Sequence, residues 1–448
     1  MLSDTIAAIS TAAGEAAISV IRLTGPRALE IAQKAFQLPA KVVPRFAHLV
    51  RACDENGAVI DSGLFLHFKA PASYTGEHCV EFHGHGGVLV TQRVLERVLA
   101  CGARAAEAGE FTQRAFLNGK MDLTQAEAVM DLIHAQSTLA LRAANEQLGG
   151  AIGREASAMQ QSLIPVLAHV EAYIDFPEED IAPETGADLL RRIDAVREQA
   201  RRLLATSEQG RILRHGARTV ISGAPNVGKS SLLNLLLGYE RAIVSATAGT
   251  TRDTIEEIIQ VHGIPLRLVD TAGLREAGDD IERIGIERTH RELERADLIL
   301  EVADATQPPQ AVSRLDLPAQ AAARRIFILN KADLGEHAGW SGEKDAIRLS
   351  CVTRDGMEPL RDAIRDIIAR AGALASDHPV AINARHQAAF TRAAERLDAA
   401  RAALEKNEAP EFVALELRET MQALGEVIGQ VDVERVLDVI FSSFCIGK

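Results

Sequence analysis

The sequence predicts a protein of mixed α/β and α class, in which an α/β domain is inserted into a helical domain behind an N-terminal α+β domain. Three observations predict this arrangement. Short β-rich runs mix with two helical patterns in residues 1–118, helical patterns cover 119–215 and 376–448, and strands alternate with helices over 216–375. Either helical stretch alone would leave apolar faces exposed, so we expect the two stretches to form one domain.

Length and composition fit several globular domains. The chain has 448 residues, which is enough for about three domains at roughly 150 residues each. Hydrophobic residues make up 47% of the chain but aromatic residues only 4%, so the cores must rest on Ala, Leu, Ile and Val, which favours helices. The five cysteines are scattered and form no CxxC pair, which indicates neither a disulfide framework nor a zinc site.

The sequence predicts a cytoplasmic protein that does not span a membrane. It contains no run of about 18 apolar residues, and Met1–Ser10 lacks the basic and apolar regions of a signal peptide. The net charge of -13 argues against broad, non-specific nucleic-acid binding. The arginine-rich stretch Arg191–Arg218 is either a solvated helix face or an RNA contact.

Hydrophobic periodicity predicts the individual elements. In the N-terminal part we expect strands at Ala16–Leu23, Gly63–Phe68 and Cys79–Phe82. We expect helices at Ala28–Phe36 and Val90–Ala100. The first helical stretch begins near Asp122, where Thr124 and Glu127 match a capping box. In the α/β part we expect a hairpin turned at His262–Gly263, and strands at Thr219–Ser222, Ile255–Val261, Ile264–Asp270, Asp297–Ala303, Arg325–Asn330 and Ile347–Cys351.

A phosphate-binding loop follows the first strand of the α/β part. Gly223–Ser230 reads G-A-P-N-V-G-K-S and opens a Leu-rich helix at Ser231–Leu237, which is the context expected of a P-loop. Its glycines let backbone N–H groups approach the phosphates, and the helix N-terminus adds positive potential. Lys229 neutralises the outer phosphates, and the Ser230 hydroxyl binds Mg²⁺.

A second motif selects the base. Asn330–Asp333 reads N-K-A-D and follows a strand, at the sheet edge where doubly wound folds bind ligands. The Asp333 carboxylate can accept from both N–H donors on the Watson–Crick face of guanine, whereas adenine presents an acceptor there, so GTP is chosen over ATP. After the last strand, Ser350 and Cys351 can present backbone N–H groups to the guanine carbonyl.

Two more segments complete a GTP-hydrolase site. Asp270–Gly273 supplies a carboxylate behind the Mg²⁺ water shell and a glycine amide for the γ-phosphate, and Thr250 and Thr251 can reach Mg²⁺. We expect nucleotide contacts from Gly223, Asn226, Val227, Gly228, Lys229, Ser230, Ser231, Ser245, Ala246, Thr247, Ala248, Gly249, Thr250, Thr251, Asp270, Thr271, Ala272, Gly273, Asn330, Lys331, Ala332, Asp333, Ser350, Cys351 and Val352.

Hydrolysis needs a group that positions the attacking water. Leu274 stands where many switch GTPases carry a Gln for this task, and an aliphatic side chain cannot perform it. Glu282 is the best acidic candidate for this catalytic role, and a solvated glutamate at a helix start is the alternative. Arg252 and Arg275 are candidates for an arginine finger. Asn226, with carbonyls of Ser245–Thr250, could instead hold a monovalent cation that does the same electrostatic work.

Several blocks of the sequence resemble one family, the tRNA-modification GTPases MnmE, also called TrmE. These blocks are Asp4–Ile6, Ser73–Glu77, Glu81–Gly87, Gly109–Glu127, Ala248–Asp253, Asp270–Arg275, Glu282–Glu287 and Phe444–Lys448. Many families share a GTPase core, but they do not share the terminal C-I-G-K or the N-G-K block at Asn118–Lys120. The resemblance covers nearly the whole chain.

The resemblance implies a reaction and its partners. It implies a homodimer formed through an N-terminal domain that binds a tetrahydrofolate derivative, in the 5-formyl or the 5,10-methylene form. It implies a heterotetramer with the flavoprotein MnmG that installs an aminomethyl or carboxymethylaminomethyl group at C5 of the wobble uridine of certain tRNAs. It also implies K⁺-dependent hydrolysis in which Glu282 positions water, Ser230 and Thr251 hold Mg²⁺, and K⁺ is held by Asn226, Ser245, Thr247 and Thr250.

The folate site is implied in the same way. The matching positions are Arg22, Glu81, Lys120 and Lys448. A carboxylate suits the donor edge of a pterin and cations suit its glutamyl tail, although each residue is otherwise an ordinary surface charge. Cys445 matches the near-terminal cysteine of the family. Its thiol could have a chemical role or a structural role, and the sequence leaves both alternatives open.

The sequence departs from the family pattern near the folate site. Thr11–Ala17 stands where the family usually has a P-P-G-R-G-G turn, so we expect the local loop to differ. Cys351 stands where Ala is common, which a backbone contact tolerates. His83 and His85 suggest a metal pair, but two histidines on one strand without a third ligand are more typical of a structural role.

Two other functions fit the GTPase motifs. A ribosome-assembly GTPase would need an RNA-binding appendage, and the N-terminal blocks argue against it. A regulatory module would use GTP only as a switch. A comparison of GTP turnover in K⁺ and in Na⁺ separates these functions.

Overall fold

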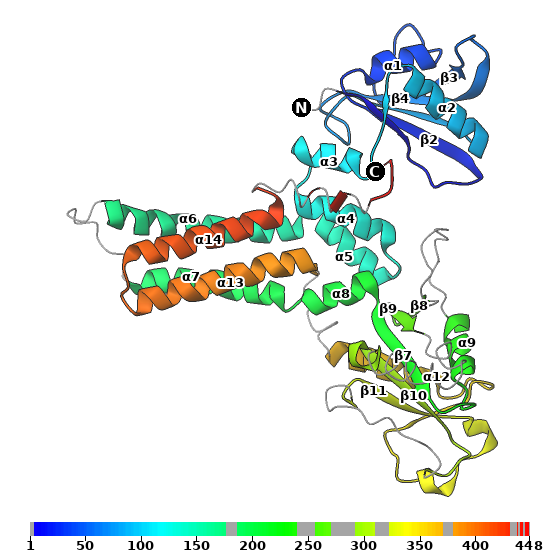
Figure 1. Ribbon diagram of the computed structural model, residues 1–448, viewed down its shortest axis with the longest axis vertical. Coiled ribbons are helices and arrows are strands. Elements are labelled where there is room, and N and C mark those ends of the chain that lie inside the picture. Colours follow the sequence, from blue (N-terminus) through cyan, green and yellow to red (C-terminus); the bar gives the residue numbers. More distant parts are fainter. Residues whose placement is uncertain are drawn as a thin grey trace, which may run out of the picture. The chain divides into compact units, whose positions relative to one another are not determined.

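The computed structural model describes residues 4–175, 186–239, 256–269, 292–309, 322–370, 380–430, 437, 440–441 and 444–447. The chain divides into two compact units (Figure 1). One unit combines Met1–Met130 with Gly425–Lys448, and the other is Asp131–Leu424. Within the described part, no helix has the length and apolar character of a membrane span.

The first unit contains a six-stranded sheet with helices packed against it. The strand order is β3-β4-β5-β2-β1-β6, and the bounds are β1 Ile6–Ile9, β2 Ala16–Thr24, β3 His48–Cys53, β4 Val59–Phe68, β5 Cys79–Gly86 and β6 Arg104–Ala105. Helices α1 (Ala28–Ala35) and α2 (Val88–Ala100) bury Ile31 and Val98 against a core that includes Phe65 and Phe82. The predicted α+β class is confirmed.

Three strands of this sheet were not predicted. β1 reads I-A-A-I and β6 has only two residues, so neither carries the β-branched alternation that marks a strand in sequence. β1 nevertheless lies inside the sheet, antiparallel to β2 and parallel to β6. Its alanines are buried because larger residues of neighbouring elements cover them.

The start of α4 (Leu123–His134) corrects the predicted capping box. Asp122 Oδ1 accepts the backbone N–H of Gln125 at 2.9 Å, and Gln125 Oε1 accepts the backbone N–H of Asp122 at 3.0 Å. The reciprocal cap is therefore formed by Asp122 and Gln125, and the prediction of Thr124 with Glu127 is wrong. Thr124 is buried inside the first turn, where its hydroxyl donates to Asp122 at 2.6 Å.

The second unit contains a bundle of long helices from both sides of the α/β segment (Figure 1). The helices are α5 Thr138–Leu148, α6 Ala151–Asp175, α7 Gly186–Leu204, α8 Ser207–His215, α13 Ala384–Glu405 and α14 Pro410–Ile428. Gln160 of α6 donates to the Met421 carbonyl at 2.9 Å, and Arg401 of α13 pairs with Asp194 of α7 at 3.1 Å. The helices before and after the α/β segment therefore pack together, while the domain boundaries given above stay predictions.

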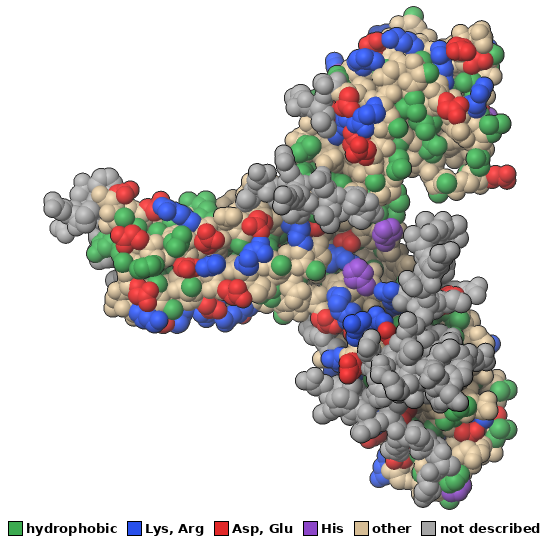
Figure 2. All heavy atoms as spheres, viewed as in Figure 1, with side chains coloured by type: hydrophobic (Ala, Val, Ile, Leu, Met, Phe, Trp, Pro, Cys, Tyr) green, Lys and Arg blue, Asp and Glu red, His purple; other side chains and the backbone are tan. Residues whose placement is uncertain are grey.

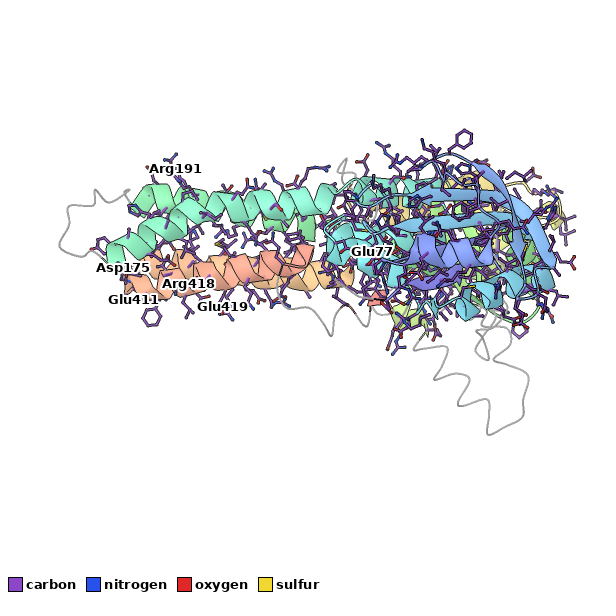
Figure 3. All side chains as sticks on the ribbon, turned by 90° about the horizontal axis from the view of Figure 1, so that it is seen from above. Glu77, Asp175, Arg191, Glu411, Arg418 and Glu419 are labelled. Atoms are coloured by element: carbon purple, nitrogen blue, oxygen red, sulfur yellow. The ribbon has the colours of Figure 1, made fainter. Side chains whose placement is uncertain are left out.

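The arginine-rich stretch Arg191–Arg218, which covers most of α7, all of α8 and the residues that follow, is paired with acids. Seven of its arginines have an acidic partner, namely Arg191, Arg197, Arg201, Arg202, Arg211, Arg214 and Arg218. Charged side chains such as Arg191 and Arg418 project from the outer surface of the bundle (Figure 3). Because carboxylates neutralise these arginines, the structure favours a solvated helix face over an RNA contact.

The α/β segment forms a doubly wound sheet in the order β12-β11-β10-β7-β9-β8. Its strands are β7 Ala217–Gly223, β8 Glu256–Val261, β9 Ile264–Val269, β10 Leu298–Asp304, β11 Arg325–Asn330 and β12 Ile347–Leu349. Only β8 pairs antiparallel, and its hairpin with β9 turns at His262 and Gly263, which both have positive φ, as predicted. Helices α9 (Lys229–Tyr239) and α12 (Met357–Ile368) belong to the same segment.

Candidate guanine-nucleotide site

The phosphate loop leaves β7 along a path that only glycine allows at two points. Gly223 has φ of +150°, and a Cβ there would lie 2.2 Å from the Val302 carbonyl oxygen. Gly228 has φ of +100°, and a Cβ there would lie 2.1 Å from Asn330 Nδ2. Asn226, between them, adopts the left-handed conformation and is exposed. The loop therefore presents backbone, with little side chain in the way, at the start of α9.

Lys229 begins α9 and reaches across the loop. Its Nζ donates to the carbonyl oxygens of Gly223 at 3.1 Å and of Ala224 at 2.7 Å. The ammonium therefore lies at the mouth of the loop, where the sequence analysis expects the outer phosphates. Ser230 and Ser231, at the first turn of α9, are exposed.

Asn330 joins the phosphate loop to the base-recognition loop. Its Nδ2 donates to the Val227 carbonyl at 2.9 Å, and its Oδ1 accepts the backbone N–H of Cys351 at 3.3 Å. The residue is only 2% exposed. We call this arrangement the Asn330 clamp. Asn330 was predicted to contact the nucleotide. In the structure its side chain forms hydrogen bonds to the two loops that would surround the nucleotide.

Lys331 and Asp304 form an ion pair beside the clamp. Lys331 is in the left-handed conformation, and its Nζ lies 2.6 Å from Asp304 Oδ2. Burial acts to raise the pKa of Asp304, but hydrogen bonds from Lys331 and Thr306 outweigh it, so the net pKa lies below the ordinary value. Sequence reasoning missed Asp304. The available signal was its position at the end of β10, opposite Asn330 in parallel register.

Asp333 and the loop after β12 lie close together. Asp333 is exposed on a short 3₁₀ turn, Ala332–Leu334. Burial, and then the charge of Asp333, raises the pKa of the Cys351 thiol to about 11. Ser350 donates its N–H to the Asp355 carbonyl at 3.0 Å, whereas the Cys351 N–H has only the 3.3 Å contact with Asn330. Of the two predicted amides, Cys351 therefore has the weaker partner within the protein.

The carboxyl ends of three parallel strands bring these parts to one sheet edge. Gly223 of β7 pairs with Val302 of β10, and Asp304 of β10 pairs with Asn330 of β11. Val269, the last described residue of β9, pairs with Val220 of β7. The predicted residues that lie outside the described part are Ser245, Ala246, Thr247, Ala248, Gly249, Thr250, Thr251, Asp270, Thr271, Ala272, Gly273, Glu282 and Lys448.

In the first unit, Arg22 and Glu81 form a second cluster. They face each other on β2 and β5, with Arg22 Nε 2.9 Å from Glu81 Oε1. The guanidinium also lies 5.9 Å from the centre of the Tyr74 ring. Burial acts to raise the pKa of Glu81, but His83 at 2.9 Å and the charge of Arg22 outweigh it, so the net pKa is lowered. The cluster therefore keeps a carboxylate and a cation together on the sheet.

Lys120 and the C-terminal residues belong to the same unit. Lys120 Nζ donates to the Pro71 carbonyl at 3.2 Å. Ile446 bridges to Ala108, and the Ser10 hydroxyl donates to the Gly447 carbonyl at 3.2 Å. A Cβ on Gly447 would lie 2.4 Å from the Ile9 carbonyl oxygen, so this position needs glycine. The C-terminal segment is thus held at the end of β1, next to the loop at Thr11–Ala17.

His83 and His85 each have a carboxylate partner. His83 bonds to Glu81, and His85 Nδ1 lies 2.7 Å from Asp61 Oδ1. No group of three His, Cys, Asp or Glu side chains suited to a metal ion occurs among the described residues. The arrangement favours the structural interpretation of this histidine pair over the metal pair.

A buried arginine connects three of the sequence blocks. Sequence reasoning did not detect this connection. Arg114 is 1% exposed and pairs with Asp4 at 2.8 Å, with Glu110 at 2.9 Å and with Glu77 at 3.3 Å. These partners come from the blocks at Asp4–Ile6, Ser73–Glu77 and Gly109–Glu127. No local pattern reveals such a network because its members are up to 110 residues apart.

Comparisons with known proteins agree with this organisation. The family described as "MnmE helical domain" matches residues 123–445, and the family described as "GTP-binding protein TrmE N-terminus" matches residues 5–120. A relative from Akkermansia muciniphila, named tRNA modification GTPase MnmE, is 54% identical over 452 residues and covers 99% of each chain. A relative of the same name from Aquifex aeolicus is 43% identical over 455 residues and covers 100% of each chain.

Among solved structures, the G domain of the T. maritima FeoB iron transporter is 25% identical and covers 34% of this chain and 98% of that chain, with a TM-score of 0.25. At that score the fold assignment rests on the strand order and phosphate loop described above. The full-length matches and both family matches establish one conclusion: the chain belongs to the MnmE (TrmE) family of tRNA modification GTPases.

Proposed function

We propose that this GTPase hydrolyses GTP as part of the modification of C5 of the wobble uridine of certain tRNAs, in the cytoplasm. In this proposal it works as a homodimer with the flavoprotein MnmG in a heterotetramer, and a tetrahydrofolate derivative, 5-formyl or 5,10-methylene, supplies the one-carbon unit. The observation that carries the GTPase part is the Asn330 clamp, which holds the phosphate loop and the base loop in one piece.

The clamp supports guanine selection. It fixes the Cys351 loop relative to the phosphate loop, and the exposed Asp333 lies close enough to raise the pKa of the Cys351 thiol. The Asp333 carboxylate would supply acceptors, and the nearby backbone N–H of Cys351 would supply a donor, to the same base. Guanine presents two N–H donors next to a carbonyl acceptor, so the arrangement fits guanine and leaves adenine with unpaired groups.

The residues at the start of α9 fit the two cations. Ser230 and Asn226 are exposed polar side chains on either side of Lys229, and both offer the oxygen ligands that Mg²⁺ and K⁺ prefer. Ser230 with Thr251 would hold Mg²⁺, and Asn226 with Ser245, Thr247 and Thr250 would hold K⁺. The cations would supply positive charge to the phosphates in the transition state. Glu282 would orient the attacking water.

The first unit supports the folate site. Arg22 and Glu81 form a salt bridge, so the donor edge of a pterin could take the place of Arg22 beside the Glu81 carboxylate. Within the described part of the chain, the Lys120 ammonium donates to the Pro71 carbonyl. Gly447 lies against Ile9, one residue from Ala8, and Ala8 is the strand partner of Arg22. Gly447, which precedes Lys448 in the sequence, therefore lies at the end of the sheet that carries Arg22.

Exposed apolar side chains of the first unit support the homodimer. Large apolar residues with high exposure are Ile18, Leu49, Val59, Leu64, Val88 and Leu89, and Leu49 reaches 80%. Apolar side chains also gather on the face of this unit in view in Figure 2. Four of these residues lie on strands of the sheet and two, Val88 and Leu89, begin α2, and so many exposed large apolar residues in one unit fit a surface buried by a second copy.

GTP turnover by the purified protein, measured in equal concentrations of K⁺ and Na⁺, tests the hydrolysis part. We expect turnover to be at least 10-fold faster in K⁺, because the cation would do the work of an arginine finger. Equal rates would refute the cation proposal. Nucleoside analysis of tRNA from cells lacking the protein tests the modification part, and wobble uridines modified at normal levels would refute it.

A further inference from the structure

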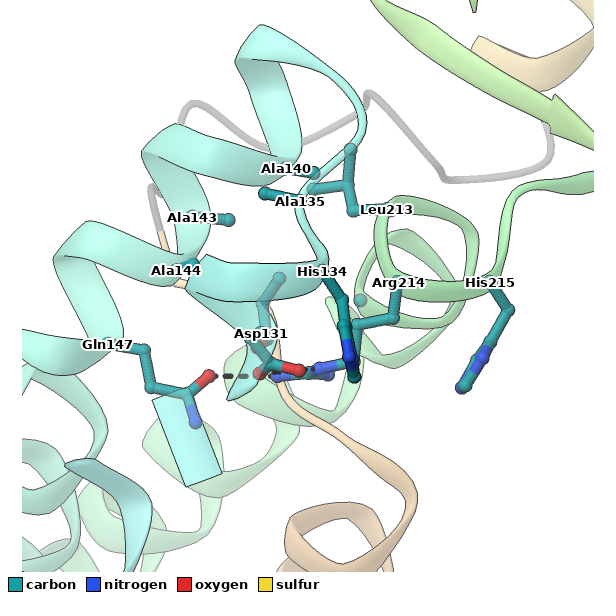
Figure 4. A pocket seen from close by; sticks show the side chains of 12 residues that line it. Asp131, His134, Ala135, Ala140, Ala143, Ala144, Gln147, Leu213, Arg214 and His215 are labelled. Carbon is teal, nitrogen blue, oxygen red and sulfur yellow. Dashed lines mark hydrogen bonds and ion pairs between the residues drawn. The ribbon is translucent and has the colours of Figure 1, made fainter. Parts of the chain in front are cut away.

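A cavity of about 140 Å³ lies in the Asp131–Leu424 unit, at the junction of the helical and α/β parts. Its walls come from the end of α4, from α5, from α8 and from Ala381, where the chain returns to the helical part (Figure 4). α8 ends at His215, and β7, which carries the phosphate loop, begins at Ala217. No residue of the proposed nucleotide or folate sites lines this cavity.

The cavity has an apolar side and a polar end. Ala135, Ala140, Ala143, Ala144 and Leu213 form the apolar side. At the polar end, Asp131, Gln147 and Arg214 are joined by hydrogen bonds (Figure 4). A ligand that fills the space must therefore combine a hydrocarbon part with a group that arginine recognises.

Arg214 is fixed on most of its guanidinium. Its Nε lies 2.8 Å from Asp131 Oδ2, and its Nη2 donates to Gln147 Oε1 at 2.8 Å and to the Ala381 carbonyl at 3.5 Å. Within the part of the chain that the structure describes, its Nη1 is buried and has no hydrogen-bond partner. A buried charged donor without an acceptor is destabilising by about 1–3 kcal/mol or more, so this nitrogen favours a ligand that brings an acceptor.

The surrounding charges limit the ligand to a single negative charge. Asp131 already pairs with Arg214, so a dianion such as hydrogen phosphate would be repelled by that carboxylate and poorly solvated by the alanine wall. Arg211 and Arg267 lie near the same end and help, after partial burial and the charge of Arg214, to hold the pKa of His215 below its ordinary value. Arg211 is itself paired with Glu208 and Asp297, so the positive groups at the rim can offset no more than a single negative charge on a ligand.

Gly210 lies where two segments of the cavity wall pack closely together. A Cβ on Gly210 would lie 2.1 Å from the Ile382 carbonyl oxygen, so α8 and the return segment can touch only because this residue is glycine. The contact places Ala381 where its carbonyl oxygen meets Arg214. The polar end is thus held by three separate elements, and not by one flexible side chain.

We propose that this cavity binds a small aliphatic monocarboxylate, whose carboxylate accepts from Arg214 Nη1 and whose hydrocarbon part lies against Ala140, Ala143 and Ala144. A carboxylate matches the N–H donors of arginine, and the alanine side suits a short alkyl chain. A bound carboxylate would contact both points at which the chain crosses between the helical and α/β parts.

Saturation-transfer NMR with sodium butyrate on the full-length protein tests the proposal. We expect saturable binding, weakened at least 10-fold by Ala143→Leu, which fills the cavity. Arg214→Lys should also weaken it at least 10-fold, because an ammonium keeps the charge but loses the N–H fork. Ala158→Leu, at an exposed position of α6, is the matched control and should bind like the parent. Thermal unfolding of each variant verifies that it is folded.

Two results would overturn the proposal. The first is butyrate binding that is not saturable, or that persists unchanged in a folded Ala143→Leu variant, because binding would then occur elsewhere. The second is displacement of butyrate by an equal concentration of inorganic phosphate, because the site would then accept oxyanions without regard to charge or to an apolar part. Ala143→Leu leaves Arg214 untouched, so the test does not depend on how Arg214→Lys folds.

Discussion

Replacement of Asn330 by Ala tests the clamp that holds the nucleotide site together. The change removes the buried hydrogen bond to the Val227 carbonyl and the part-buried one from the Cys351 N–H. A buried group left without its partner costs about 1–3 kcal/mol, and the part-buried N–H, which water can reach, costs about 1 kcal/mol, so the two together should cost about 2–4 kcal/mol. The phosphate loop and the base loop would then no longer be fixed to each other.

The expected effect on affinity follows from that range. If the lost free energy must be recovered when nucleotide assembles the site, GTP binding weakens roughly 30- to 1,000-fold. Titration with a fluorescent GTP analogue measures this, and urea unfolding of the free protein separates lost stability from lost affinity. Asn56→Ala, at an exposed turn of the other unit, is the control and should bind GTP normally. A folded Asn330→Ala variant with parental GTP affinity would refute the clamp argument.

Three further predictions rest on the structure, and a fourth rests on the proposed role of Glu282. Arg114→Met removes the cation that pairs with Glu77 and leaves Glu110 with Arg104 as its cation, so it should lower the free energy of unfolding by about 3–5 kcal/mol in urea titrations. Arg191→Met, at an exposed position, should leave the free energy of unfolding nearly unchanged, and equal effects of the two variants would contradict the network. Glu81, Glu110 and Asp304 have pKa values in the folded protein that lie below their ordinary values in spite of burial. Their contribution to stability is therefore present above about pH 4 and is lost as the pH falls through the folded pKa values. Urea unfolding midpoints that stay constant from pH 6 to pH 3 would argue against these ion pairs. The exposed Cys445 should react with iodoacetamide at pH 8 well before Cys351, because burial and Asp333 raise the pKa of the Cys351 thiol to about 11. Peptide mass spectrometry that finds Cys351 labelled first would contradict this prediction. Glu282→Ala should abolish GTP turnover with GTP affinity retained, and a variant with normal turnover would remove Glu282 from its proposed role.

The parts of the fold that sequence predicted are those with local signals. The β7 strand, the phosphate loop and α9 follow each other in the chain, so glycine positions and apolar runs reveal them together. The turn at His262–Gly263 was predictable for the same reason. β1 was missed because its own residues carry no strand pattern, and it is a strand only through its pairing with β2 and with the distant β6.

The candidate site shows the same division. Motif positions placed Lys229, Asn330 and Asp333 at one sheet edge, but they did not reveal that Asn330 bonds to the loops themselves. Asp304 could not be assigned because a single acid after an apolar run has many explanations, and only the parallel register with Asn330 gives it a partner in Lys331. The Arg114 network likewise depends on tertiary contacts that no local pattern records.

Calorimetric titration of the purified protein with GTP and with ATP, at equal Mg²⁺ and K⁺, tests the central claim most directly. The account predicts tight binding of GTP, at least 100-fold weaker binding of ATP, and loss of most of this preference in Asp333→Ala, because the carboxylate is what distinguishes the two bases. Equal affinity of the parent protein for both nucleotides would contradict it.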